Sequence, residues 1–481
     1  MDRTVETVIE SVLNEQRQEM SRSLVLALQS QVGAASIWRN DTKVKLIRQG
    51  PVKANLNQNQ KIRKTRDRTS APSPSHPSIP LPAGFEVAPP VLALGHEQET
   101  AFCLVNRGRA IFPSHPQGLA ADGSNGISNA DDRQRHHKTV SQCRQLLGGM
   151  PAAIALDAHS AHPHPDLGQG IAATHRLSTY PVQSHHAQIA ACMVAHHIPL
   201  DTPPVLGITL DRLGRGDDDT LWGGEFLLAD YRGFRRLATF KPIALIGGDQ
   251  APHQPWRSTY AHLMASFDWD DVQSAYGELE ILQFINDQPR EMLNQMVLTG
   301  IHAPRASSCG QLIDAVAAAV GLCRDRTAYE GQAAQELAAL VDDASLAIAQ
   351  DSPYGFTIQW LHRCTERQLP YIEPIPMWWQ ILEDLQQQMP ISLISARFHV
   401  GLARAIADMT HHLSQDNPID QVALTGSVFE NRVLLALVRQ FLSEMGLTVL
   451  SPSQEPFLDG SIALGQGAIA AAQTLKRRNS R

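Results

Sequence analysis

The stretch Val205–Ala229, VLGITLDRLGRGDDDTLWGGEFLLA, joins two apolar runs through a turn rich in glycine and aspartate. The run 205–210 predicts a buried strand, and the run 222–228 predicts its partner. Glycines beside carboxylates in the turn would let backbone N–H groups approach an oxyanion while the carboxylates hold a divalent cation. A solvated acidic hairpin is the other interpretation of such a turn. Gly223 and Gly224 inside the second run favour a close approach by a ligand or by another backbone.

Composition predicts a globular protein without a strong charge bias. The 481 residues are 43% hydrophobic and 19% charged, and the formal net charge of −7 argues against a general nucleic-acid surface. The six cysteines include no C-x-x-C pair, so neither zinc-finger cysteines nor a disulfide framework is predicted. No apolar run reaches the roughly 18 residues of a membrane span, and the start MDRTVETVIE lacks the order of a signal peptide. We therefore expect a cytoplasmic protein with no membrane and no nucleic-acid partner.

The chain contains a weak internal repeat. A strand-turn-strand-turn-strand pattern occupies 91–113 and recurs at 205–240. Such a repeat predicts an α/β fold of two related lobes with a cleft between them. The predicted parts are an N-terminal helix and hairpin at 1–52, a Pro/Ser-rich linker at 53–89, a first lobe at 90–204 and a second lobe with helical insertions at 205–481.

Three segments open predicted helices after a turn. They contain Gly310 with Asp314, then Gly426 with Asn431, and finally Asp459. Each segment alone is a plausible helix cap or turn. A helix that begins there points its first N–H groups at whatever occupies the cleft, so the three together favour a nucleotide-type site.

Several blocks of sequence resemble one known family. They are LDRLGRGDDDTLWGGEFLLADYRGF, SSCGQLIDAVAAAVGLC, YEGQAAQELAAL, ARFHVGLA and DGSIALGQGAIAA. From about Pro90 to Gln473 the chain is similar to the C-terminal part of the HypF family, the carbamoyltransferases of nickel–iron hydrogenase maturation. The resemblance implies a two-lobed fold of the actin-like ATPase and sugar-kinase (ribonuclease-H-like) superfamily, as in the tRNA threonylcarbamoyl-transferases. It also implies ATP or carbamoyl-adenylate in the cleft, Mg or another divalent metal on the phosphates, and transfer of a carbamoyl group to the C-terminal cysteine of a HypE-like partner.

The resemblance also implies site residues. Asp459 matches the family's metal-binding aspartate, whereas the family's metal-binding histidines, in V-Q-H-H-H-A-H, fall at Ser184 and Gln188. Glu99 stands where the family's first glycine turn carries a lysine, and its negative charge would repel a polyphosphate. The resemblance assigns no catalytic residue. It places these residues around the nucleotide: Asp211, Gly214, Gly216, Gly223, Gly224, Gly310, Asp314, Gly426 and Asn431.

Two hypotheses of function follow. The family's acylphosphatase-like domain, C-x-x-C zinc pairs and adenylate-forming domain have no recognisable counterpart in this sequence. The first hypothesis is a carbamoyltransferase domain that accepts carbamoyl-adenylate made elsewhere. The second is a pseudoenzyme that keeps the fold and binds a nucleotide or a partner as a scaffold, which the lost imidazoles favour. A role in tRNA modification is disfavoured, because the WGGEFLLADY and YEGQAA blocks are of the hydrogenase-maturation type.

Overall fold

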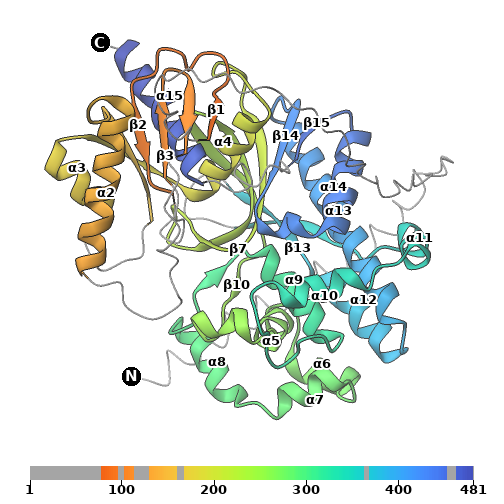
Figure 1. Cartoon of the computed structure of the whole chain (residues 1–481). Helices are drawn as coiled ribbons and strands as arrows, with labels where there is room; N and C mark the ends of the chain where they lie inside the picture. Colours follow the sequence, from red (N-terminus) through yellow and green to blue (C-terminus); the bar gives the residue numbers. More distant parts are fainter. Residues whose placement is uncertain are drawn as a thin grey trace, which may run out of the picture. The chain divides into compact units, whose positions relative to one another are not determined.

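Two β-sheets, with helices between and around them, make up the described part of the chain (Figure 1). The computed structural model describes residues 77–95, 102–112, 129–159, 167–361, 368–451 and 462–479. The helix and hairpin predicted for 1–52 lie outside these residues, as does the first part of the predicted linker. No helix within the described ranges is both long and apolar enough to span a bilayer.

The first sheet has the strand order β1-β4-β3-β2-β5-β6. Its strands are β1 (Ser78–Pro80), β2 (Val91–Ala93), β3 (Cys103–Asn106), β4 (Arg109–Ile111), β5 (Ala153–Asp157) and β6 (Ser178–Val182). Because successive side chains of a strand point to opposite faces, Leu104 and Ile154 turn to one face, while Val105 and Ala155 turn to the other. Helices α2 (Asn129–Leu147) and α3 (Leu167–His175) cover the first of these faces.

The second sheet has the strand order β12-β13-β9-β8-β7-β14-β15. Its strands are β7 (Val205–Arg215), β8 (Leu221–Asp230), β9 (Gly233–Phe240), β12 (Thr357–Leu361), β13 (Leu369–Glu373), β14 (Gln421–Thr425) and β15 (Thr448–Leu450). The short strands β10 (Ile243–Ala244) and β11 (Arg305–Ala306) pair with each other, and β11 also pairs with β8.

The two sheets share one connectivity. In the first, the meander β2-β3-β4 is antiparallel and β5 and β6 follow in parallel beside β2. In the second, the meander β7-β8-β9 is antiparallel and β14 and β15 follow in parallel beside β7. The two meanders predicted from the repeat are therefore present, and the predicted two-lobed α/β fold class is confirmed.

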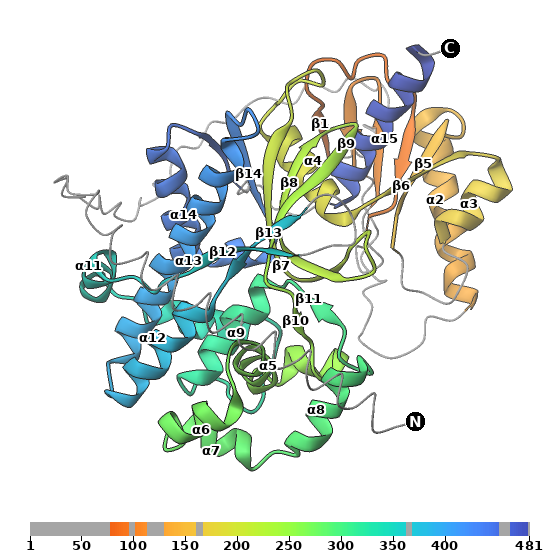
Figure 2. The ribbon, with the colours of Figure 1, turned by 180° about the vertical axis from the view of Figure 1, so that it is seen from behind.

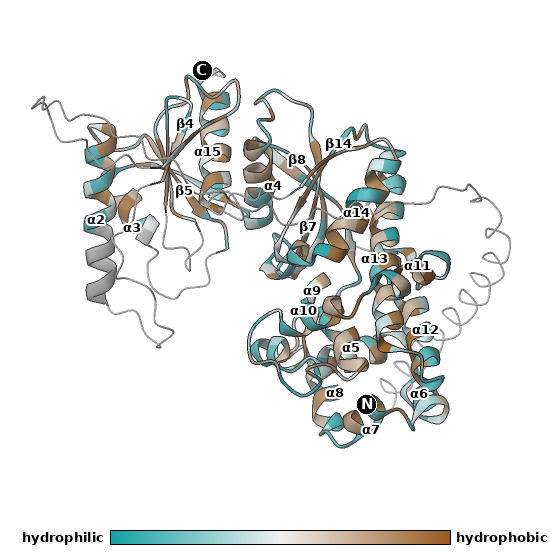
Figure 3. Cartoon of the chain, turned by 45° about the vertical axis from the view of Figure 1, so that its right-hand side comes forward, coloured by the Kyte–Doolittle hydropathy of each residue, from teal (hydrophilic) through white to brown (hydrophobic). Residues whose placement is uncertain are grey.

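Two helices lie between the sheets, as Figure 3 shows. They are α4 (Ser184–Ala195) and α15 (Ile462–Asn479), which come from distant parts of the chain. Their apolar residues join one buried cluster with Val105 and Ala155 of the first sheet and Leu227 of the second. The α4–α15 pair thus supplies the core shared by the two lobes.

The remaining helices lie to one side of the second sheet and below it in the view of Figure 2. They are the 3₁₀ helices η1 (Gly248–His253) and η2 (Ser427–Glu430), and α5 (Trp256–Ser266), α6 (Trp269–Tyr276), α7 (Glu280–Asn286), α8 (Arg290–Thr299), α9 (Cys309–Ala319), α10 (Gln332–Ala339), α11 (Asp343–Asp351), α12 (Ile375–Gln386), α13 (Ile391–Ser414) and α14 (Arg432–Glu444). Helix α8 begins directly after Pro289, which is tolerated before the first helical turn but not inside a helix.

Residues 77–89, predicted as the end of the linker, belong instead to the packed structure. Strand β1 pairs with β4 at the edge of the first sheet. Phe85 is fully buried and meets Tyr231 edge-on with 5.1 Å between ring centroids. The prolines there do fit an extended chain, and an edge strand accepts Pro80 because one side of it needs no ladder hydrogen bond. The Pro/Ser-rich composition is typical of an extended backbone, but it did not predict that these residues pack against β4 and Tyr231.

Candidate functional site

A pocket of about 700 Å³ opens beside the carboxyl end of β7 and is the best candidate for a ligand site. Its volume lies within the range of small-molecule sites, roughly 300–1,000 Å³. The walls combine charged groups with apolar ones, as a site for a nucleotide requires. The lining residues are Arg212, Gly310, Ile313, Glu330, Gly331, Ala334, Gln335, Ala338, Ala339, Ser427, Val428, Glu430, Asn431, Arg432 and Val433.

Helices α9 and α14 meet this pocket at their N-terminal ends, whereas α10 lines it along its whole length, from Gly331 to Ala339. Gly310 lies in the first turn of α9, Gly331 is the N-cap of α10, and Asn431 is the N-cap of α14. Gly331 has φ +86°, a left-handed conformation that glycine adopts without strain. Helix N-termini carry unpaired N–H groups and positive partial charge, so the pocket favours an anion.

Arg212 is the basic residue most deeply set in the pocket wall. It is 9% exposed and forms an ion pair with the fully buried Asp314. Burial raises the pKa of Asp314 to about 6, although the Arg212 charge pulls it down. On the rim, Glu330 Oε1 lies 3.2 Å from Arg212 Nε. Asp314, predicted to lie around the nucleotide, thus acts on the pocket through Arg212.

Asn431 is fixed by a buried histidine. Its Oδ1 accepts from the Leu434 N–H at 3.1 Å, so its Nδ2 donates to His399 Nε2 at 2.9 Å. His399 Nδ1 then donates to the Ser395 carbonyl at 2.7 Å. Burial lowers the pKa of His399 to about 4, so the ring is neutral near neutral pH.

This histidine predicts a pH dependence of stability. Because the folded pKa is about 4 and the unfolded pKa is about 6.5, the unfolded chain takes up a proton first and stability falls as the pH drops through this window. Between pH 7 and pH 5, wild type should lose about 2 kcal/mol more than His399→Gln. Urea unfolding at both pH values checks this, and equal losses in the two proteins would contradict it.

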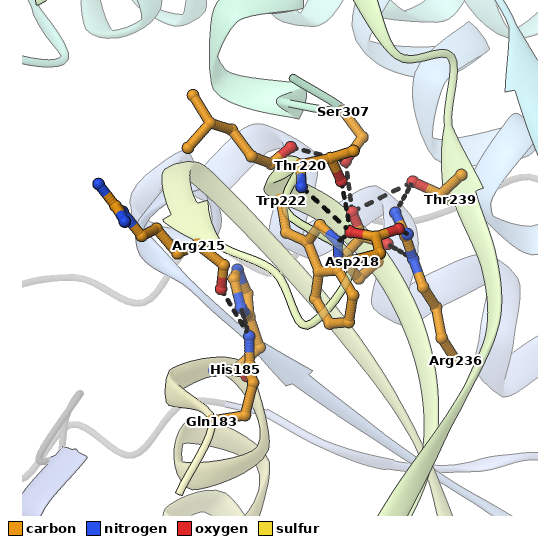
Figure 4. A network of polar contacts seen from close by, with 11 residues as sticks. Gln183, His185, Arg215, Asp218, Thr220, Trp222, Arg236, Thr239 and Ser307 are labelled. Atoms are coloured by element: carbon orange, nitrogen blue, oxygen red, sulfur yellow. Dashed lines mark hydrogen bonds and ion pairs between the residues drawn. The ribbon is translucent and has the colours of Figure 1, made fainter. Parts of the chain in front are cut away.

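The turn between β7 and β8 is held by a network of charged side chains that are buried or partly buried (Figure 4). Asp218 accepts from Thr220 and from Trp222 Nε1, and pairs with Arg236 at 2.7 Å. Burial would raise the pKa of Asp218, but these hydrogen bonds and the Arg236 charge lower it to about 2. Arg236 also donates to Glu225 at 2.6 Å. The Asp218 carboxylate, predicted to be available to a cation, therefore serves the hairpin itself.

Most glycines predicted to line the ligand site pack against protein atoms. A Cβ on Gly214 would lie 2.6 Å from the His185 ring, and one on Gly216 would lie 2.0 Å from Trp222. Gly426, at φ +102°, faces the Leu210 carbonyl in the same way, with 2.2 Å left for a Cβ. Gly223 faces backbone at 211–212 and 308, and Gly224 faces the Phe240 ring and the backbone at 307. Of the predicted set, Gly310 and Asn431 line the pocket, and the ligand contacts of the others stay predictions.

The resemblance aligns Ser184 and Gln188 with the family's metal-binding histidines. Gln188 Nε2 donates to Asp211 Oδ2 at 2.9 Å. The other oxygen of Asp211 accepts from the Ser427 N–H at 2.8 Å and from its hydroxyl at 3.0 Å. With Ser184, the position offers a hydroxyl and an amide in place of two imidazoles, so it does not fit the family's two-histidine metal site. Asp459 and Glu99 lie outside the described residues.

The histidines that remain in this motif are structural. Gln183 caps α4 by accepting from the N–H groups of His185 and His186, and its Nε2 donates to the Arg215 carbonyl at 3.0 Å. His186 Nε2 bonds to the Asp230 carbonyl at 2.7 Å. Burial lowers the pKa of both histidines. Within the described residues, no group of three or more His, Cys, Asp or Glu side chains is placed to hold a metal ion.

Sequence reasoning did not select Arg212, Glu330, Glu225 or Arg236. The available signal for the first was an arginine directly after Asp211, in a segment rich in glycine and aspartate. For Glu225 and Arg236 the signal was an opposite pair of charges in two apolar neighbouring strands, where a buried charge needs a partner.

Comparisons with known proteins agree with this architecture. The chain matches the HypF Kae1-like domain over residues 86–195, and the second subdomain of the carbamoyltransferase Kae1-like domain over 207–466. Carbamoyltransferase HypF of Rhodobacter capsulatus is 34% identical over 396 residues, which are 82% of this chain and 48% of that protein. The carbamoyltransferase HypF homolog of Cupriavidus necator is 32% identical over 82% of this chain and 94% of that protein. The chain thus spans about half the length of the first relative and nearly all of the second.

Solved structures share the fold. Full-length HypF in its phosphate- and nucleotide-bound form has 28% sequence identity and a TM-score of 0.65, over 82% of this chain and 47% of that chain. HypF of T. kodakarensis has 24% identity and a TM-score of 0.66, over 83% of this chain and 50% of that chain. The family models cover both lobes, and the Cupriavidus necator homolog matches along almost its whole length, so this chain belongs to the HypF carbamoyltransferase family.

Proposed function

We propose that the chain is a carbamoyl-transfer unit that binds ATP or carbamoyl-adenylate in the 700 Å³ pocket. The carbamoyl acceptor is the C-terminal cysteine of a HypE-like partner, by analogy with the family. The observation that carries the proposal is that the N-terminal ends of α9 and α14 meet at one pocket beside Arg212, since helix N-termini are typical of phosphate-binding sites.

The pocket lining contains groups that suit both parts of a nucleotide. The apolar residues Ile313, Ala338 and Val428 can pack on a base, because aromatic faces are buried best against apolar side chains. Arg212 and the N-terminal ends of α9 and α14 can hold the phosphate, because charge-assisted hydrogen bonds are strong where water is excluded. A nucleotide-bound HypF is known among the related structures.

The transfer step follows from the chemistry of an acyl-adenylate. The partner's thiolate attacks the carbamoyl carbon, a C–S bond forms, and the bond from that carbon to the phosphate oxygen breaks. The products are a thiocarbamate and AMP, with no redox change. This chain contributes by holding the AMP moiety, and Arg212 with the N-terminal ends of α9 and α14 stabilises the phosphate that leaves.

A non-catalytic binding role is the second candidate. One contact favours it, namely the bond from Gln188 to Asp211, because it fills with an amide the position that holds a metal-binding histidine in the family. In that case the chain would bind a nucleotide or the partner without turnover.

Two measurements on the purified chain separate these functions. Calorimetric titration with ATP should show saturable binding, and a HypE-like protein mixed with chain and carbamoyl-adenylate should gain a carbamoyl group on its C-terminal cysteine, seen by intact-mass spectrometry. Binding without transfer above a chain-free control would favour the non-catalytic role. Absence of binding to both ATP and carbamoyl-adenylate would refute the proposed site.

A further inference from the structure

Arg212 carries a hydrogen-bond donor that the described structure does not satisfy. One terminal nitrogen of its guanidinium pairs with Asp314, which fixes the side chain. Its Nε is buried and has no hydrogen-bond partner, because Glu330 Oε1, although 3.2 Å away, is not aligned to accept. Buried donors without an acceptor are rare and costly. An unmatched donor in the wall of a ligand pocket therefore indicates an acceptor supplied by the ligand.

Glu330 forms an ion pair with Arg212 that a ligand can displace. Its side chain is 69% exposed, whereas the Asp314 side chain is fully buried. An exposed ion pair is worth little and a long side chain can leave it easily. A ligand oxygen entering the pocket can thus replace Glu330 on Arg212 while Asp314 keeps the guanidinium in position.

The neighbouring carboxylate, that of Asp211, is largely occupied by hydrogen bonds within the protein. Both oxygens of Asp211 already accept hydrogen bonds, from Gln188 and from Ser427. The side chains of Asp211 and Arg212 follow each other on β7 and point to opposite faces of the strand, the first toward α4 and the second toward α9. Two guanidinium groups line the pocket, those of Arg212 and Arg432, and Arg212 is the buried one.

We propose that Arg212 binds the phosphate of the nucleotide directly, while Asp314 holds its guanidinium in position and Glu330 moves away from it. Nucleotide binding to this chain then does not require a divalent cation. This inference rests on the proposed nucleotide pocket. It assigns to an arginine the charge neutralisation that a metal ion supplies at many phosphate sites.

The test is calorimetric titration of wild type and variants with ATP and with adenosine, each with excess Mg²⁺ and with excess EDTA. Wild type should bind ATP with affinities that agree within about threefold in the two buffers. Arg212→Gln should weaken ATP binding about 10- to 100-fold and change adenosine binding by less than about twofold, since adenosine carries no phosphate. Glu330→Gln should tighten ATP binding severalfold, because it removes the competing carboxylate.

Matched variants separate the phosphate contact from other causes. Arg212→Lys keeps the charge and should retain more ATP affinity than Arg212→Gln, and Asp325→Asn, on the exposed surface away from the pocket lining, should behave as wild type. If Arg212→Gln does not fold, the double variant Arg212→Gln with Asp314→Asn avoids a buried unpaired carboxylate and takes its place.

Three results would overturn the inference in different ways. ATP binding lost in EDTA but unchanged in Arg212→Gln would assign the charge to a cation, with the buried Gln188 Oε1, which has no partner among the described residues, as a candidate ligand. Equal loss of ATP and adenosine binding in Arg212→Gln would show that the residue shapes the pocket without touching phosphate. If wild type binds neither ligand, it is the nucleotide pocket itself that is refuted.

Discussion

Replacing Arg236 by methionine is expected to lower the free energy of unfolding by about 3–5 kcal/mol, because it leaves two carboxylates without their shared cation. Arg236 donates to Glu225 at 2.6 Å and to Asp218 at 2.7 Å, and it lies over the Trp222 ring at 4.3 Å (Figure 4). Glu225 is fully buried and also accepts from the hydroxyl groups of Thr239, at 3.1 Å, and of Ser307. Two hydroxyl donors cannot compensate a buried negative charge once the guanidinium is gone.

Arg235→Met is the matched control for this substitution. Arg235 is the preceding residue on β9, is exposed, and donates to Asn417 at 2.7 Å. Its loss should cost less than about 0.5 kcal/mol, as is usual for exposed polar contacts. Guanidinium chloride unfolding of the three proteins measures the difference. Equal stabilities of Arg236→Met and Arg235→Met would mean that water reaches Glu225 in the folded state.

The strand pattern of both lobes could be read from the sequence because it depends on local alternation. Apolar runs with turn residues between them define β2-β3-β4 and β7-β8-β9. The packing of residues 77–89 could not be read in this way, because their contacts are with β4 and Tyr231, which are distant in sequence. Composition reports conformational preference, whereas burial depends on the partner surface.

The candidate site was only partly predictable for the same reason. A glycine in a turn indicates that another group of atoms lies close to its Cα, but it does not identify that group. At Gly216 it is the Trp222 ring, and at Gly310 it is the stem of Arg212 beneath the pocket. Gly310 and Asn431 were predicted by their place at helix starts, where local sequence determines the geometry. Arg212 and Glu330 come together only through the approach of β7 to the segment before α10, which no local pattern indicates.

Gly465 lies at the contact between α15 and α4, at the junction of the lobes. Gly465→Ala is expected to lower the free energy of unfolding by about 3 kcal/mol. A Cβ at Gly465 of α15 would lie 1.8 Å from the Ala187 carbonyl oxygen of α4, so two helix backbones would have to separate. Helix propensity alone would favour alanine by about 1 kcal/mol, and steric repulsion must exceed that gain.

Gly467→Ala is the matched control in the same helix. Its Cβ would meet a side-chain methyl of Val105 at 2.9 Å rather than backbone, so its stability should stay within about 1 kcal/mol of wild type. Urea unfolding ranks the two variants, and a Gly465→Ala protein as stable as Gly467→Ala would show that α4 and α15 can move apart without cost. Since α4 also carries Gln188, whose amide holds Asp211 beside the pocket, separating these helices should weaken ATP binding in Gly465→Ala as well.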